Sequence, residues 1–151
     1  MSNARLARPS HSGDRQGIAV TRIAARWVLA LLLVAAGLSH LTWGRRGYRI
    51  TVPDWATRLL RTDKDMIVVA SGAVEVMLGV ALVALPRDRP RVGGIVAAFF
   101  VAVLPGNVHQ WRTGRSAPLL RTDGARFIRL FLQIPLIAWA LWCTRLDASD
   151  E

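Results

Sequence analysis

Four apolar segments alternate with charged connections along the chain. They cover residues 27–43, 66–85, 92–108 and 127–143, so each holds 17 to 20 residues. A helix that rises 1.5 Å per residue needs about 17–25 residues to cross a hydrocarbon core. The pattern therefore predicts an all-α protein, an up-down bundle of four transmembrane helices.

The sequence around these segments predicts three parts of the chain. We expect a disordered basic N-terminal arm over residues 1–21, a four-helix membrane domain over 22–145 and an acidic tail over 146–151. The Arg-rich start and the small residues at 35–37 also fit a secretory signal. No clear Ala-x-Ala cleavage site follows them, which favours a first membrane span.

Composition supports a membrane location and excludes several other classes. Of the 151 residues 52% are apolar, more than a soluble domain of this length can bury, although the net charge is +10. Because the charges gather between apolar runs, we expect the lipid bilayer as partner and no nucleic acid. Cys143 is the single cysteine, which excludes an intrachain disulfide and thiol-disulfide chemistry by this chain alone.

The distribution of basic residues determines the orientation in the membrane only weakly. With four spans, nine of the 20 basic residues fall on the side of the termini and eleven on the other side, so the positive-inside rule does not decide. One short connection over residues 86–91 faces two longer loops, and this asymmetry favours both termini in the cytoplasm.

Glu75 is the most informative polar residue. It lies about ten residues into the second segment, near mid-membrane, with no other charge in that span. A charge at this depth costs roughly 2.5–3.5 kcal/mol, so the carboxyl group must be protonated, paired or next to water. An ionisable residue in this position is a functional-site hypothesis by default.

Alternating helices bring several polar residues to the same membrane side. We predict one intramembrane polar pocket formed by His40, Glu75, Asn107, His109, Arg129 and Gln133. Structural alternatives remain: a Glu75–Arg129 ion pair that only locks the bundle, or Arg129 and the histidines in the headgroup layer. No residue is assigned a catalytic role.

Small residues indicate where helices pack closely. Ser71, Gly72 and Gly79 share a face of the second segment with Glu75. Gly94, Ala98, Ala102 and Gly106 form a stripe at spacing four in the third segment. We expect both sets to contact neighbouring helices.

The motifs AAGLSHLTWGRRGY, VPDW, SGAVEVMLGVALV, VLPGNVH and RLFLQIPLIAWA together resemble the DoxX-like family of small four-helix bacterial membrane proteins. The matching residues, one group per span, are Gly37 and His40; Ser71, Gly72 and Glu75; Pro105 and Asn107; and Arg129, Leu130 and Gln133. Leu41 and Phe131 depart from the usual pattern. The resemblance implies a multi-pass protein of the bacterial plasma membrane, and some such proteins resemble subunits of thiosulfate:quinone oxidoreductase or of redox assemblies.

These observations lead to a functional hypothesis. The chain is expected to be a subunit or accessory of a membrane redox complex, with a partner protein and a pocket for a quinone headgroup or for proton relay. The sequence has no Cys-x-x-Cys pair, Gly-rich nucleotide loop, haem-ligand spacing or metal motif. A small proton-coupled transporter and a non-catalytic membrane scaffold remain as alternatives.

Overall fold

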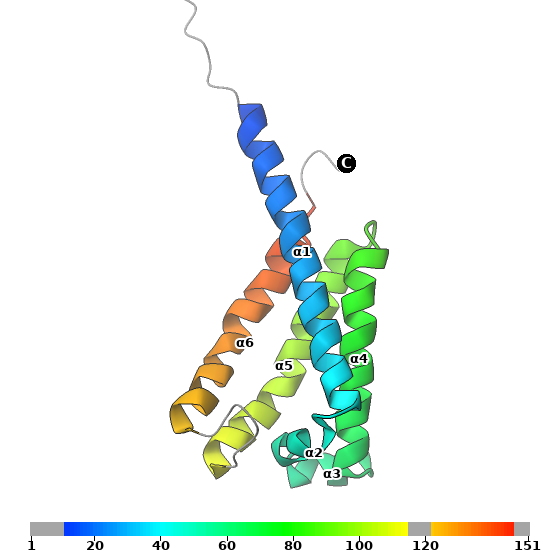
Figure 1. The fold of residues 1–151 in the computed structure, drawn as a ribbon, viewed down its shortest axis with the longest axis vertical. Helices are drawn as coiled ribbons and strands as arrows, with labels where there is room; N and C mark the ends of the chain where they lie inside the picture. Colours follow the sequence, from blue (N-terminus) through cyan, green and yellow to red (C-terminus); the bar gives the residue numbers. More distant parts are fainter. Residues whose placement is uncertain (1–10, 115–121, 147–151) are drawn as a thin grey trace, which may run out of the picture.

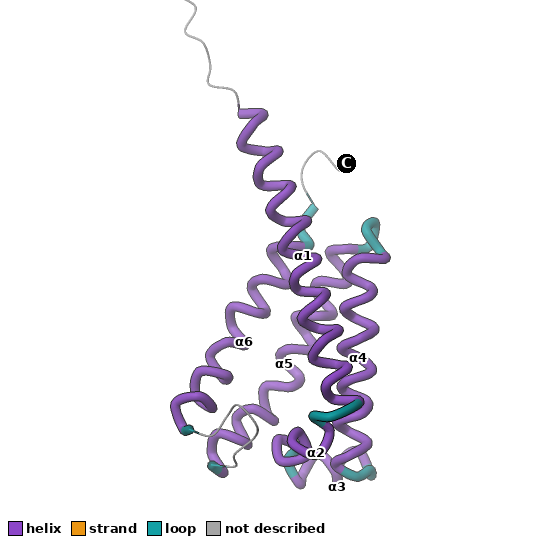
Figure 2. The backbone as a smooth tube through the Cα atoms, in the orientation of Figure 1, coloured by secondary structure: helices purple, strands orange, loops and turns teal. Residues whose placement is uncertain are grey.

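A computed structural model describes residues 11–114 and 122–146, and all regular structure in these ranges is helical (Figure 2). Four long helices are joined at one end by short ones. The elements are α1 (His11–Leu41), α2 (Arg45–Tyr48), the 3-10 helix η1 (Arg49–Thr51), α3 (Asp54–Leu60), α4 (Lys64–Ala84), α5 (Arg89–Thr113) and α6 (Asp123–Cys143).

Local capping sets the ends of the long helices. Asp63 precedes α4, and its side chain accepts a hydrogen bond from the backbone N–H of Met66 at 2.8 Å. Thr122 caps α6 in the same way through the N–H of Ala125. Gly114 ends α5 with a φ of 63°, a left-handed conformation that glycine adopts without steric cost.

Two boundaries differ from the sequence-based expectation. Residues 11–21, predicted to belong to a disordered arm, are the first turns of α1, because extending an existing helix adds one hydrogen bond per residue. Residues 1–10 and 147–151, the rest of the arm and most of the acidic tail, lie outside the described residues. The third helix does not end near Pro105 but continues to Thr113, since membrane helices tolerate an internal proline.

Three of the described helices are long and apolar enough to cross a membrane: Gln16–Leu41, Lys64–Ala84 and Arg89–Thr113. These helices indicate a membrane protein. The apolar part of α6, Phe127–Cys143, is shorter than 18 residues and does not reach the same length. The expected four spans are therefore supported for three helices.

The long helices form two pairs, α1 with α4 and α5 with α6 (Figure 1). In the first pair, Gly37 and Gly72 bring two backbones together: a Cβ added to Gly37 would lie 2.5 Å from the carbonyl oxygen of Gly72. Gly79 approaches Ala30 equally closely. Gly72 and Gly79, expected to pack against a neighbouring helix, both lie at this close approach, which leaves no room for side chains there.

The second predicted stripe of small residues packs closely against a neighbouring element only at Gly106, where an added Cβ would lie 3.1 Å from the carbonyl oxygen of Thr51 in η1. Ala98 and Ala102 are exposed, and a Cβ on Gly94 would meet nothing within 4 Å. Close packing in α5 occurs one residue away, where a Cβ on Gly93 would collide with the side chain of Thr144. Residues spaced by four do share one face of α5, but the close helix contact is made by the neighbouring face, which carries Gly93.

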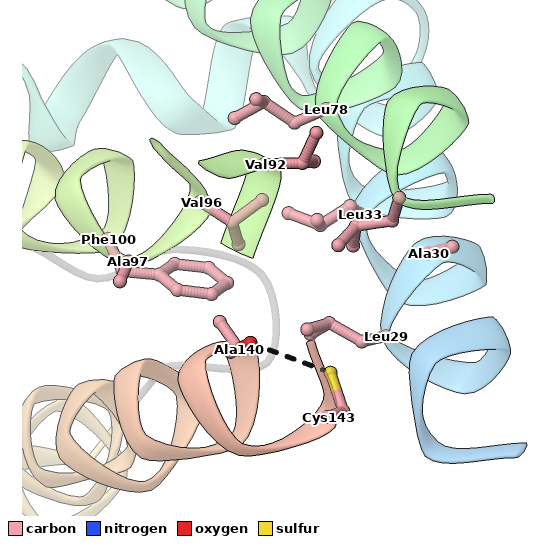
Figure 3. Packing of buried hydrophobic residues seen from close by; sticks show 11 residues of the cluster. Leu29, Ala30, Leu33, Leu78, Val92, Val96, Ala97, Phe100, Ala140 and Cys143 are labelled. Atoms are coloured by element: carbon pink, nitrogen blue, oxygen red, sulfur yellow. Dashed lines mark hydrogen bonds between the residues drawn. The ribbon is translucent and has the colours of Figure 1, made fainter. Parts of the chain in front are cut away.

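The two pairs meet at one end around an apolar core. This core draws from all four long helices, as Figure 3 shows: Leu29, Ala30, Leu33, Leu78, Leu82, Val92, Val96, Ala97, Phe100, Ala140 and Cys143. All these residues lie toward the end where α4 leads into α5. At the opposite end the pairs diverge, and α2, η1 and α3 lie there (Figure 1).

Candidate ligand-binding cavity

A cavity of about 450 Å³ lies where the helix pairs diverge. Every helix contributes to its wall, and most of the lining side chains are apolar. Five of the six predicted pocket residues line it: His40, Glu75, Asn107, Arg129 and Gln133. Its volume lies within the range of about 300–1,000 Å³ that is usual for small-molecule sites.

His40 and Glu75 form the central polar contact. Nδ1 of His40 lies 2.7 Å from Oε2 of Glu75, and the two side chains are only 12% and 10% exposed. The glycines of the α1–α4 crossing explain this proximity. A Cβ on Gly72 would lie 2.7 Å from Cβ of His40, and one on Gly37 would lie 3.0 Å from Cβ of Glu75. Close backbones thus let one short side chain from each helix meet away from lipid.

Tyr48 connects this pair to α6. Its ring packs edge-on against the imidazole of His40, with 4.0 Å between the ring centroids. On its other side, Cζ of Arg129 lies 5.9 Å from the centroid of the same ring, within cation–π range. Tyr48 therefore lies between the anion–imidazole pair and the guanidinium group.

An ionic clamp at the surface holds the segment that carries Tyr48. Asp65, in the first turn of α4, pairs with Arg45 and Arg49, and Nε of Arg49 donates to its carboxylate at 2.7 Å. Lys64 pairs with Asp54 of α3 in the same region. These contacts tie α2, η1 and α3 to the start of α4, which fixes Tyr48 over the cavity.

Arg129 is held by α5 and not by Glu75. Its Nη1 donates to Oε1 of Gln110 at 3.3 Å, and Gln110 is only 1% exposed. The expected Glu75–Arg129 ion pair is not formed, because His40 occupies the carboxyl group. Contacts therefore run from α4 through α1, α2 and α6 to α5.

Two further amides line the cavity with unpaired atoms. Nδ2 of Asn107 and Oε1 of Gln133 are buried and have no hydrogen-bond partner among the described residues. Both side chains are more than nine-tenths buried, at 6% and 7% exposed. Leaving such a group unpaired costs about 1–3 kcal/mol. Because both residues line the cavity, a polar ligand there is a candidate partner for these groups.

The other residues predicted for the pocket or for helix packing lie partly outside and partly inside the cavity. His109 does not line the cavity; its half-buried side chain lies on another face of α5. Ser71 and Ala102, predicted as packing residues, line the cavity instead. Among the described residues no cluster of three metal-ligating side chains forms.

Sequence reasoning missed two residues of this site, Tyr48 and Gln110. Helix phase was a usable signal for Gln110, since residues 107 and 110 share a face at 3.6 residues per turn, whereas 107 and 109 are nearly opposite. Tyr48 had no comparable signal, because its position depends on how the chain folds back after α1.

The chain belongs to a family described as a domain of unknown function, DUF8561, which it matches over residues 29–144. The matched region includes the cavity and the four long helices apart from the start of α1. No curated protein and no solved structure matches the chain. The family assignment thus covers the site and leaves its chemistry to be inferred from the geometry.

Proposed function

We propose that this chain is a multi-pass protein of the bacterial plasma membrane, of the DoxX-like type, whose cavity binds the headgroup of a quinone. In this proposal it acts as a subunit or accessory of a membrane redox complex, with the electron carrier on a partner protein. The observation that carries the proposal is the pair of unsatisfied buried amides, Asn107 and Gln133, in the wall of a largely apolar cavity.

The proposal includes α6 as the fourth span. Its apolar part, Phe127–Cys143, measures about 26 Å at 1.5 Å per residue, near the lower limit for crossing a hydrocarbon core. Its long contact with α5 supports this, because a helix packed along a spanning helix lies at the same depth. Both termini would then lie on one side, which we place in the cytoplasm.

A quinone needs an apolar slot for its ring, donors for its carbonyl oxygens and a group that supplies protons on reduction. Phe99 and Phe100 offer apolar surface within the cavity. The amide of Asn107 and the guanidinium of Arg129 offer donors. The imidazole of His40, whose Nδ1 lies 2.7 Å from Oε2 of Glu75, and the hydroxyl group of Tyr48 beside it are groups that can exchange protons with a ligand.

Replacing Asn107 with leucine separates binding from folding. Leucine has a similar size and removes the unsatisfied amide, so the free energy of unfolding should stay the same or rise by about 1 kcal/mol. Affinity for a short-tailed benzoquinone, titrated into the purified full chain in detergent, should fall about tenfold, as expected for one lost hydrogen bond in a dry site.

His109→Leu is the matched control, because it removes a polar side chain of α5 that is half-buried and lies outside the cavity. It should leave quinone affinity unchanged. Equal affinity in the Asn107 variant and the wild type would refute the proposal. A wild-type protein that binds no quinone, but moves protons or a cation across vesicles in a Glu75-dependent manner, would favour the transporter.

A further inference from the structure

The cavity is lined by both buried and exposed residues on two neighbouring helices, α4 and α5. On α5, Phe100 is buried, Val103 is half-buried and Ala102 is exposed. On α4, Val68 is buried and Ala70 is exposed. The cavity therefore does not end behind α4 and α5 but continues to the outer surface between them.

The packing of the helices agrees with this course. α4 and α5 contact each other far less than either contacts its own partner, and they separate toward the end that carries the cavity (Figure 1). Each of the two helices also lines the cavity with a small exposed residue, Ala70 on α4 and Ala102 on α5.

This passage lies at the depth of the hydrocarbon core. Ala70 stands six residues into α4, about 9 Å from its first residue, and Ala102 lies well inside α5. The lining residues of the cavity that are exposed are all apolar: Trp55, Leu59, Leu60, Ala70, Ala102 and Pro105. By contrast, the unpaired amides and the charged groups lie on the buried side. The cavity thus has a polar interior and an apolar mouth.

From this polarity we infer that the cavity opens sideways into the bilayer between α4 and α5, and that the isoprenoid tail of the bound quinone leaves through this lateral opening. That the bound molecule is a quinone with an isoprenoid tail rests on the proposed function. The lateral opening itself is inferred from the residues that line the cavity. A headgroup would meet Asn107 inside, while an apolar chain would pass Ala70 and Ala102 into lipid without crossing water.

Ala102→Trp tests the path of the tail. The full chain, in detergent, is titrated with a decyl-tailed benzoquinone and with the same ring carrying a methyl group in place of the tail. The indole would occupy the opening, so affinity for the tailed compound should fall about tenfold through steric overlap, whereas affinity for the tailless compound should stay unchanged. Ala98→Trp is the control, an exposed position one turn away that does not line the cavity.

The inference is overturned if both tryptophan variants bind the tailed compound equally well, or if Ala102→Trp weakens both compounds alike. A thermal melt of each variant checks that the fold is kept. Both positions are exposed and neither belongs to the apolar core.

A second measurement examines the opening without quinone. A nitroxide is attached at Ser71→Cys, inside the cavity, in a Cys143→Ser background and in lipid nanodiscs. Lipid-soluble oxygen should relax the label strongly and a water-soluble nickel chelate only weakly, and Ala102→Trp should lower the oxygen effect.

The two measurements separate the possible failures. If the wild type binds neither quinone but the oxygen pattern holds, the proposed function fails and the lateral opening stands. If the nickel chelate reaches the label better than oxygen does, the cavity opens to water and the inference is wrong, whatever binds inside.

Discussion

The His40–Glu75 contact gives the sharpest test of how this fold keeps a carboxyl group inside a membrane. The perturbation is a double-mutant cycle with Glu75→Gln, His40→Asn and the double variant. Both replacements are uncharged and close in size to the originals, so each removes one ionisable partner while the packing at the Gly37–Gly72 crossing remains.

The expected magnitude follows from the geometry. At 2.7 Å and an effective dielectric constant of about 20, opposite unit charges attract by about 6 kcal/mol. Desolvation of the two buried ions, at several kcal/mol each, offsets most of this attraction. Measured polar pairs within a membrane protein reach at most about 1.7 kcal/mol. We therefore expect each single variant to lose about 2 kcal/mol and the coupling to be about 1.5 kcal/mol.

The assay is reversible unfolding in mixed micelles, with dodecyl sulfate as denaturant and circular dichroism as readout. The same cycle between Glu75→Gln and His109→Asn serves as control, because His109 does not line the cavity, and its losses should add within about 0.5 kcal/mol. Additive losses in the His40 cycle as well would refute the pairing, and the carboxyl group would then be retained for another reason.

Two further predictions concern packing and the surface clamp. Gly72→Ala should lower the free energy of unfolding by about 1–3 kcal/mol, because its Cβ would lie 2.8 Å from the carbonyl oxygen of Gly37. Gly94→Ala, which faces open space, should raise the free energy of unfolding by up to about 1 kcal/mol. Chemical unfolding of both variants measures this difference, and equal effects would contradict the packing argument. Asp65→Asn should leave the free energy of unfolding nearly unchanged but weaken quinone binding, because it releases the segment that positions Tyr48. High salt should weaken quinone binding to the wild type in the same way, and an affinity that does not depend on salt would contradict the role of the ionic clamp.

Hydrophobic pattern was sufficient to locate the long helices. Each of the four apolar segments falls in one long helix, apart from residues 42, 43 and 85, because an apolar run of this length satisfies its backbone hydrogen bonds internally as a helix. The ends were less certain, as α5 shows: Pro105 breaks soluble helices but not this one. Capping residues such as Asp63 marked the starts better than proline marked the ends.

The site was predicted in outline and not in its contacts. Glu75 was identified from its cost in the membrane, which any fold of this sequence must meet. The partner of Glu75 could not be identified from the sequence, because either Arg129 or His40 could pair with it. The close helix crossing at Gly37 and Gly72 brings His40 within reach of Glu75. The same limit applies to the packing stripe on α5, where Gly93 and not Gly94 meets a neighbour.

The sequence by itself thus determined the class of structure, the location of the helices and the need for polar groups around Glu75. These features depend on local hydrophobicity and on the energy of a charge in lipid. The tertiary structure alone decided which side chains meet. It packed the helix pairs at one end and separated them at the other, so the cavity, the role of Tyr48 and the opening between α4 and α5 arise from helix crossings that no local pattern records.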